Sequence, residues 1–600
     1  MNAPSRIWTD PKSRNLGRLL LLSALVGVVA GLGALAFTYI LDRSDNVFMD
    51  WAVGYNLPNP GGEGATVYPA EPQRRWLLLV LPAAGALLGS ILSHWFAPEA
   101  KGEGTDSVIA AFHRGGGIIR ARIPLVKTFA SALTIGSGGS AGREGPIAQI
   151  GAGFGSTLGT WLKVSVRERR LLMLAGTGAG IGAVFRTPFG GAFYATEVLY
   201  RDVEFETAAL IPTFVASIIS YSIYCTGTDK WNTLFTMPPM EFQHPTELAL
   251  YLVLGVCCAV VGTLYVKTFH ALRKHVFERL PIPRHFVPAI GGLLVGLMAY
   301  FVPQVLGMGY GWLQLAMNQQ LPLKLVLGLV VLKILATSFT VGSGGSGGMF
   351  APSIVIGGLL GASVGMIFHD LMPGIVTQPA AFALVGMAGF FSGVSKTPVA
   401  SLLMVSRMAA GSGLLVPLML ATAVGYLLMS RRCSIYENQV EARVDSPAHQ
   451  GEYVVDTLEG LCVRDAMPRD AKLTTLRLDA PLPEILDTVA DSKQHVFPVL
   501  DAQGELRGVI LFDDIRLFFT DHNVPIHAVV ALDLLANDLV TATPNEDLTS
   551  VMKKLRESLQ VELVVVEHEN SRRVVGILGR RHVLAMYQDR VHQRDSSPAG

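Results

Sequence analysis

One stretch of sequence occurs twice in this chain and organises the rest. The first copy, KTFASALTIGSGGSAGREGP, runs from Lys127 to Pro146, and the second, KILATSFTVGSGGSGGMFAP, runs from Lys333 to Pro352, 206 residues later. Each copy is an apolar segment, a Gly/Ser-rich break, and a Pro that opens a second apolar segment. Pro suits the first position of a helix, where its missing N–H costs nothing. Because free amides at a helix N-terminus in apolar surroundings bind anions, the repeat predicts two such sites.

The composition indicates a membrane protein. The chain has 600 residues, of which 50% are apolar and 16% charged, and its mean hydropathy is +0.41. This is too apolar for an ordinary soluble protein. The net charge of +1 gives no reason to expect nucleic acid as a partner. The five cysteines are scattered without a CxxC pair, which argues against a disulfide framework and against a zinc site, so we expect no metal.

Most of the apolar sequence lies before residue 430 and is broken into short runs. Leu19 to Ile40 reads as a first membrane helix. Four basic residues precede it and predict a cytoplasmic N-terminus over residues 1–18: Arg6, Lys12, Arg14 and Arg18. Many later runs are too short to span a bilayer and are interrupted by Gly or Pro. Broken helices in matching halves are typical of transporter folds with a site near the midplane.

The duplication extends past the breaks, because Arg186-Thr-Pro188 matches Lys396-Thr-Pro398. We therefore expect an all-α, polytopic membrane domain over 19–432, built from two repeats at about 19–224 and 248–432. The pattern does not reveal whether the halves are inverted, but convergence of two helix N-termini on one site would require it.

The sequence after residue 432 is polar and soluble in character. Residues 433–460 read as a linker. Strands and helices then alternate in two α/β units at 461–520 and 530–590, followed by a polar tail at 591–600. This pattern predicts a small paired α/β regulatory module.

One acid stands inside the first copy of the repeat, in Arg143-Glu144-Gly145-Pro146. An ionisable group at membrane depth is costly and is a functional hypothesis by default. Free amides at a helix N-terminus would stabilise this carboxylate in a place where an anion could also sit. Once protonated it would leave, so we interpret Glu144 as a pH-sensitive gate; a plain capping acid is the alternative. Phe350 occupies the equivalent position in the second copy, which leaves bare amides there.

Both breaks also match the G-x-S-x-G pattern of serine hydrolases, at Ser140 and Ser346. An intramembrane serine hydrolase, with a His as the base, is therefore a remote alternative. The pattern is weak in Gly-rich sequence, and its repetition at equivalent positions is what helix packing would produce. We expect a protein that is not an enzyme.

These motifs, with Ser434-Ile-Tyr436 after the last apolar run, resemble the CLC family of chloride channels and chloride/proton antiporters with a C-terminal pair of CBS domains. The resemblance implies a homodimer of subunits with inverted halves and one anion pathway each. It implies that Glu144 is the external gate, that the amides of Met349 and Phe350 and the Tyr436 hydroxyl bind the anion, and that no cofactor is required. The first motif adds two residues to this anion-binding set, Arg143 and Gly145.

Two positions depart from the family pattern. The first anion motif of the family, Gly-Ser-Gly-Ile-Pro, falls at Gly102-Glu103-Gly104, so an acid replaces the serine. An acid beside an anion site repels anions unless it is protonated or turned away. The internal proton-transfer glutamate of the antiporters falls at Val198, which cannot carry a proton, with Glu197 just before it.

The sequence thus favours gated, uncoupled transport of chloride or another small anion, with proton-coupled exchange as the alternative. The resemblance also implies an adenine nucleotide between the CBS units, with Asp513 or Asp514 meeting a ribose hydroxyl; a structural dimerisation module is the alternative. We expect a multi-pass protein of a bacterial inner membrane. Arg431 and Arg432 after the last run predict that the C-terminus, like the N-terminus, is cytoplasmic.

Overall fold

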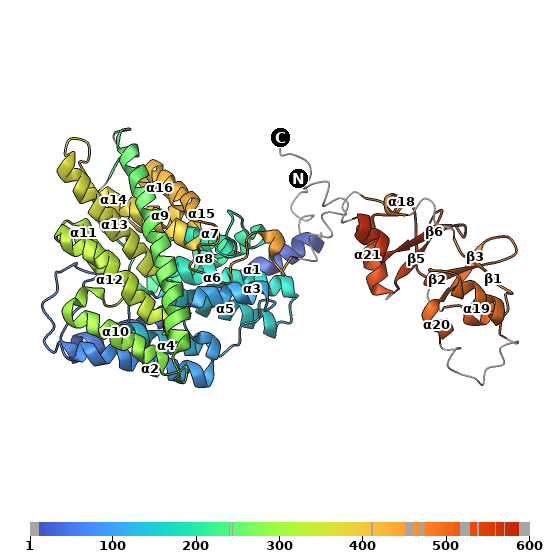
Figure 1. Ribbon diagram of the computed structural model, residues 1–600, viewed down its shortest axis with the longest axis horizontal. Coiled ribbons are helices and arrows are strands. Elements are labelled where there is room, and N and C mark those ends of the chain that lie inside the picture. Colours follow the sequence, from blue (N-terminus) through green and yellow to red (C-terminus); the bar gives the residue numbers. More distant parts are fainter. Residues whose placement is uncertain are drawn as a thin grey trace, which may run out of the picture. The chain divides into compact units, whose positions relative to one another are not determined.

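The computed structural model describes residues 11–238, 240–242, 244–409, 412–449, 461–467, 473–516, 529–536, 539–558, 560–568 and 571–586. Residues 1–10 of the predicted N-terminus, 450–460 of the linker and the whole tail at 591–600 lie outside them, as do parts of both predicted α/β units. The chain divides into two compact units, Met1–Ala448 and His449–Gly600. Figure 1 shows a helical first unit and a smaller second unit that carries the strands.

The first unit is all-helical and consists of two sets of eight helices. The first set comprises α1 Pro11–Asp45, α2 Leu77–Phe96, α3 Gly104–His113, α4 Ile123–Gly136, α5 Glu144–Trp161, α6 Val166–Val184, α7 Pro188–Glu197 and α8 Thr207–Thr228. The second set comprises α9 Glu247–Ala271, α10 Val287–Phe301, α11 Tyr310–Met317, α12 Leu323–Gly342, α13 Phe350–Leu371, α14 Pro379–Ser395, α15 Pro398–Met408 and α16 Leu415–Leu428. Six of the described helices are long and apolar enough to cross a bilayer.

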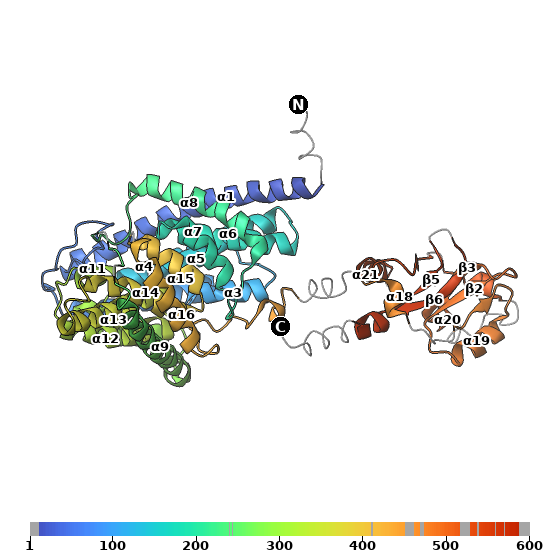
Figure 2. The same cartoon turned by 90° about the horizontal axis from the view of Figure 1, so that it is seen from above.

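Each helix of the second set has the same neighbours as its counterpart in the first. In the first half α6 packs on α5 and α8, and in the second half α14 packs on α13 and α16. The pairs α2 with α4 and α10 with α12 repeat in the same way. Figure 2 shows α1 running alongside α8, the pairing that α9 and α16 repeat in the second half. The predicted duplication is therefore present throughout the membrane domain, and the predicted fold class is confirmed.

The two breaks meet at the centre of this unit and run antiparallel. The Gly142 amide donates to the Gly348 carbonyl at 2.7 Å, and the Gly348 amide donates back to the Gly142 carbonyl at 2.7 Å. The two glycines are 206 residues apart, so each hydrogen bond is the image of the other under a two-fold axis. This reciprocity shows that a local two-fold axis relates the two halves at this point, as the expected inversion requires. Only glycine fits, because a Cβ on Gly348 would lie 2.5 Å from the Gly145 nitrogen.

The helix starts differ in one detail from the prediction. α5 begins at Glu144 and α13 at Phe350, so Pro146 and Pro352 occupy the third helical position and not the first. The third position also lies in the first turn, whose N–H groups have no partner within the helix, so proline costs nothing there either. The short helices α3 and α11 were not predicted, because neither has an apolar run long enough to stand out.

The Arg-Thr-Pro and Lys-Thr-Pro sequences break the chain in the same way in both halves. Arg186 and Lys396 have left-handed backbones, with φ of 58° and 62°. Thr187 and Thr397 follow with φ of −131° and −125°, outside the helical region. A residue before proline avoids the α conformation because of a clash with the proline ring. The interruption at 186–188 thus separates α6 from α7, as the one at 396–398 separates α14 from α15.

The second unit contains two small sheets. One has the order β1 (Leu476–Arg477), β2 (Val496–Leu500), β3 (Leu506–Leu511), and the other β4 (Thr541–Ala542), β5 (Glu562–Val566), β6 (Val574–Gly579). In each, the first pair is parallel and the second antiparallel. Helices pack beside them: α19 Leu482–Ala490, α20 Phe512–Arg516 and α21 Leu548–Glu557.

Each sheet is completed by a segment that precedes the other one in the chain. The turn of α18 (Val463–Ala466) packs in the core of the β4–β6 sheet, with Leu548 and Leu563. The turn Ala531–Leu534 packs in the core of the β1–β3 sheet. Each sheet of this unit therefore has a core that includes a segment from the other half of the unit, so the two halves are not independent along the chain.

Candidate anion site

The carboxylate of Glu144 is buried at the place where the two breaks meet, around Gly142 and Gly348, which we call the crossing of the breaks. Its side chain is 1% exposed, and its Oε1 accepts a hydrogen bond of 2.7 Å from the Tyr310 hydroxyl. A Cβ added to Gly142 would touch both the other oxygen, Oε2, and the amide nitrogen of Ala351. Glu144 thus starts α5 in the first half and places its free oxygen beside the first turn of α13 in the second half.

The arginine beside it is held by a loop that sequence analysis missed. Arg143 is 2% exposed and pairs with Glu63 at 2.5 Å, and Arg186 lies 3.6 Å from the same carboxylate. Burial alone would raise the pKa of Glu63, but the charges of the two guanidiniums hold it below its ordinary value of 4.5. Arg143 is therefore committed to an ion pair. Glu63 lies in a loop without periodicity, where no sequence signal marked it.

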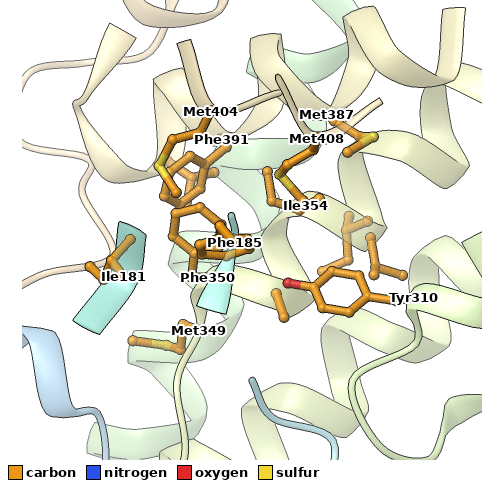
Figure 3. Packing of buried hydrophobic residues seen from close by; sticks show 14 of the residues in the cluster. Ile181, Phe185, Tyr310, Met349, Phe350, Ile354, Met387, Phe391, Met404 and Met408 are labelled. Carbon is orange, nitrogen blue, oxygen red and sulfur yellow. The ribbon is translucent and has the colours of Figure 1, made fainter. Parts of the chain in front are cut away.

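The side chain of Phe350 is surrounded by aromatic rings. Its ring lies 4.5 Å from that of Phe185 and 4.2 Å from that of Phe391, centre to centre. Figure 3 shows these three rings together, with Tyr310 nearby. Phe350 therefore fixes the start of α13 by packing and leaves its backbone amide as the polar group of that position.

Tyr436 is buried in the same region although it comes from the segment after α16. It is 1% exposed, and its hydroxyl lies 2.7 Å from that of Tyr194. Gln439 anchors the segment by donating to the carbonyls of Val198 and Ser395, at 2.9 Å each. The structure thus brings the predicted Tyr436 to the interior, and adds Tyr194, which the sequence did not single out.

The acid next to Val198 has a structural partner. Both oxygens of Glu197 accept hydrogen bonds from the start of α15, from Val399 N at 3.0 Å and Ala400 N at 2.7 Å. Val198 itself is 1% exposed and apolar. Glu197 therefore caps a helix of the second half, and Val198, the residue expected at the position of the internal acid, has no ionisable group.

The serines of the two breaks join the halves. Ser140 Oγ lies 3.1 Å from Thr337 Oγ1, and Ser346 Oγ lies 2.9 Å from Ser131 Oγ. Positions 131 and 337 are equivalent in the repeat, as are 140 and 346, so the two contacts are images of each other. The G-x-S-x-G pattern thus serves helix contact, as expected from its repetition.

Two buried lysines repeat in the same manner. Lys127 donates to the carbonyls of Ala100 and Gly102, at 3.0 and 2.7 Å. Lys333 donates to those of Val305 and Gly307, at 3.0 and 2.6 Å. Each ammonium donates to two carbonyls of the turn before a short helix, and in the first half Ser346 Oγ and Gly347 N donate to the same carbonyls at 3.1 and 3.3 Å. The lysines therefore hold the turns that lead into α3 and α11.

Two cavities open at equivalent places in the two halves. The Tyr310 cavity measures about 90 Å³ and is lined by Gly136, Gly307 and Tyr310, with Asp42, Asp45 and Glu63 as its acids. The Arg273 cavity measures about 520 Å³ and is lined by Gly102, Gly342 and Met349, with Glu103, Asp106, Lys101, Arg273, Glu278 and Arg284 as its charged groups. Gly136 corresponds to Gly342 and Gly307 to Gly102, so the two cavities occupy equivalent places. The first is lined by Tyr310, which binds Glu144, and the second by Met349 of the second break. The described residues contain no cluster of side chains that could hold a metal ion.

The second unit has a cavity of about 380 Å³ beside its sheets. It is lined by Leu506, Arg507, Leu539, Thr541, Val566, Ser571 and Arg572. Asp513 and Asp514 lie in α20 after β3 and are not among the described residues of this lining. The polar groups around the cavity are two arginines and two hydroxyls, which the sequence did not single out.

The family model described as voltage gated chloride channel matches residues 84–430, which is more than half of the chain. The chain belongs to the CLC family. The CBS domain model matches twice, at 463–521 and 530–589, so the predicted family and its CBS pair are confirmed. The family consists of anion channels and transporters, and the chain is therefore not an enzyme.

Curated relatives span both kinds of CLC protein. A putative chloride channel protein ClcB-like of Ralstonia nicotianae is 30% identical over 68% of this chain and 93% of the relative. The H(+)/Cl(−) exchange transporter ClcA of Vibrio vulnificus is 28% identical over 69% of this chain and 87% of the relative. The chloride channel protein CLC-f of Arabidopsis thaliana is 26% identical over 96% of this chain and 81% of the relative.

Solved structures share the fold. A CLC-type fluoride/proton antiporter matches with a TM-score of 0.60 and 24% identity over 71% of this chain and 98% of the other. A eukaryotic CLC transporter matches with a TM-score of 0.56 and 18% identity over 95% of this chain and 98% of the other. The chain is thus a multi-pass membrane protein of the CLC fold, whose family transports anions.

Proposed function

We propose that this CLC protein conducts chloride passively through a pathway gated by Glu144. The observation that carries the proposal is that the free oxygen of Glu144 lies beside the first turn of α13, where helix N–H groups can bind an anion. Protonation removes its charge and its attraction to the amides, so it leaves and an anion enters. The amides of Met349 and Phe350 and the Tyr436 hydroxyl then provide donors for that anion.

Uncoupled transport is proposed over exchange because of Val198 and Glu197. An apolar side chain stands where an exchanger would need a proton carrier, and the neighbouring acid is bound to two amides of α15. Proton-coupled exchange is the second candidate. It is favoured by the printed names of relatives such as ClcA of Vibrio vulnificus and by the match to antiporter structures.

The proposal includes a homodimer in the inner membrane of a bacterium, with both termini in the cytoplasm. On this orientation the Arg273 cavity faces the cytoplasm and the Tyr310 cavity faces outward. An adenine nucleotide at the CBS pair is proposed as a ligand of the cavity lined by Arg507 and Arg572, since guanidiniums suit phosphate.

The test is paired chloride and proton flux in liposomes that contain the purified full-length protein. A chloride gradient is expected to drive chloride efflux without moving protons uphill, and uphill proton movement would establish exchange instead. Glu144→Gln is expected to raise chloride flux at neutral pH and to weaken its dependence on pH. An unchanged pH response would remove Glu144 as the gate.

A further inference from the structure

Glu103 is an acid of the anion region that the proposed gating does not use. It caps α3, where its Oε2 accepts a hydrogen bond of 2.5 Å from the Asp106 amide. Its other oxygen, Oε1, is buried and accepts no hydrogen bond from the described residues. One oxygen is therefore fixed, and no hydrogen bond from the part of the chain that the structure describes fixes the other.

The free oxygen points at the crossing of the two breaks. A Cβ added to Gly145 would lie 2.6 Å from Glu103 Oε1 and 2.7 Å from Gly348 Cα. Gly145 belongs to the first turn of α5, and Gly348 belongs to the break before α13. Glu103 thus reaches the same crossing as Glu144, from another element.

Glu103 also borders one of the two cavities. It lines the Arg273 cavity of about 520 Å³, whereas Glu144 is held by Tyr310, which lines the Tyr310 cavity. The two acids therefore stand at the inner ends of two different cavities. The two acids are not equivalent residues of the repeat, because the equivalent of Glu144 is Phe350 and the equivalent of Glu103 is Met308.

The charged neighbours of Glu103 are engaged elsewhere. The Lys127 ammonium donates hydrogen bonds to two carbonyls. The Asp106 carboxylate accepts hydrogen bonds from Asn438 N and Nδ2 at 2.9 and 2.7 Å. The titratable and charged groups that face Glu103 are Asp106 on α3, Lys127 on α4, Tyr194 on α7, Tyr265 on α9, Tyr436 after α16, and, around the cavity, Lys101, Arg273, Glu278 and Arg284. None of the described groups forms an ion pair with Glu103.

The charge of Glu103 therefore acts on whatever occupies the crossing. An ionised carboxylate repels a neighbouring anion strongly where water is excluded. When it takes a proton from water in the Arg273 cavity, the carboxylate becomes a carboxyl group, the repulsion ends, and its O–H can donate to an anion. When the proton returns to that water, the repulsion is restored.

We propose that Glu103 is a second gating acid, which closes the anion pathway from the Arg273 cavity independently of Glu144. This inference rests on the proposed anion conduction. It places one acid at each cavity of the same pathway, and it makes flux depend on protonation at both.

The experiment compares chloride efflux from liposomes at symmetric pH between about 4.5 and 8 for full-length wild type, Glu144→Gln, Glu103→Gln and the double variant. In Glu144→Gln, chloride flux is expected to keep rising as pH falls, by roughly tenfold. Removal of each 1.4 kcal/mol of repulsion raises the anion occupancy of the pathway by about this factor. The double variant is expected to be fast and independent of pH.

Glu278→Gln is the matched control, since it makes the same change at a half-exposed acid of the same cavity and is expected to keep the wild-type pH response. Glu103→Ser is the second variant if Glu103→Gln fails to give monodisperse protein, because serine also caps a helix N-terminus.

The inference is overturned if Glu144→Gln alone abolishes the pH response, or if the double variant keeps the response of Glu144→Gln. These failures differ from failure of the proposed function, in which wild type and Glu144→Gln both move no chloride.

Discussion

The two cavities occupy the same place in the two halves and differ in nearly everything that matters for an anion. Gly136 and Gly307 line the Tyr310 cavity, and their equivalents Gly342 and Gly102 line the Arg273 cavity. The first measures about 90 Å³ and carries acids, and the second measures about 520 Å³ and carries three cations beside its acids. Duplication thus supplied one scaffold twice, and a few side chains made one opening narrow and acidic and the other wide and mixed.

The scaffold is recognisable by what both halves keep. Lys127 and Lys333 bind the same two carbonyls of equivalent turns, and Gly142 and Gly348 exchange equal hydrogen bonds. The residues expected to act on the anion are those that the halves do not share. Phe350 stands at the position equivalent to Glu144, and Met308 at the position equivalent to Glu103. The comparison therefore separates residues that build the crossing from residues that act in it.

The largest expected effect tests whether the two scaffolds are equivalent. Lys333→Met leaves the buried carbonyls of Val305 and Gly307 without their donor, which costs about 1–3 kcal/mol apiece, so roughly 2–6 kcal/mol. Lys127→Met is expected to lower the thermal unfolding temperature of the purified protein in detergent less than Lys333→Met does, because Ser346 Oγ and Gly347 N still donate to the carbonyls of Ala100 and Gly102. Lys324→Met, at an exposed position of α12, serves as the control and should change little. Equal losses in the two variants would show that Ser346 and Gly347 do not compensate for Lys127.

A smaller effect is expected at the gate. Tyr310→Phe removes the 2.7 Å hydrogen bond to Glu144, and a hydrogen bond to a charged group contributes about 1.5–3 kcal/mol. Release of the carboxylate should raise chloride flux at neutral pH by roughly tenfold or more, measured in liposomes. Tyr300→Phe, at a partly exposed position of α10, removes a hydroxyl away from the gate and should leave flux unchanged. Equal flux in both variants would mean that Tyr310 does not hold the gate shut.

The smallest effect concerns the charge of the wide cavity. Arg273→Gln removes one cation that is already shared with Glu437 and Glu278, at 3.2 and 3.4 Å. A half-exposed charge attracts anions only weakly and is screened by salt. We expect flux to fall by about twofold at low ionic strength and to recover at high salt. Arg279→Gln, at an exposed position outside the cavity lining, is the comparison. A loss that persists at high salt would show that Arg273 acts through structure and not through its charge.

Some features were open to sequence reasoning because they are local. The repeated KTFASALTIGSGGSAGREGP and KILATSFTVGSGGSGGMFAP segments predicted the two broken helices, and the match of Arg186-Thr-Pro188 to Lys396-Thr-Pro398 predicted that the duplication extends past them. Hydrophobic periodicity, glycine and proline mark these features in the sequence, because their effects on the backbone are local. The same sequences pointed to Glu144 and, with the last motif, to Tyr436.

Other features depend on contacts between distant segments, and no local pattern encodes them. The ion pair of Glu63 with Arg143 joins a loop to a helix start, Glu197 caps a helix of the other half, and Glu103 appeared in the sequence only as a misplaced acid. Its oxygen reaches the crossing because α3, a helix too short to predict, turns it there. The sequence alone determined which segments break and which acids are available, because those properties are local. Only the tertiary structure decided which acids meet the crossing and from which cavity, because inversion of the two halves brings together residues that are far apart in the chain.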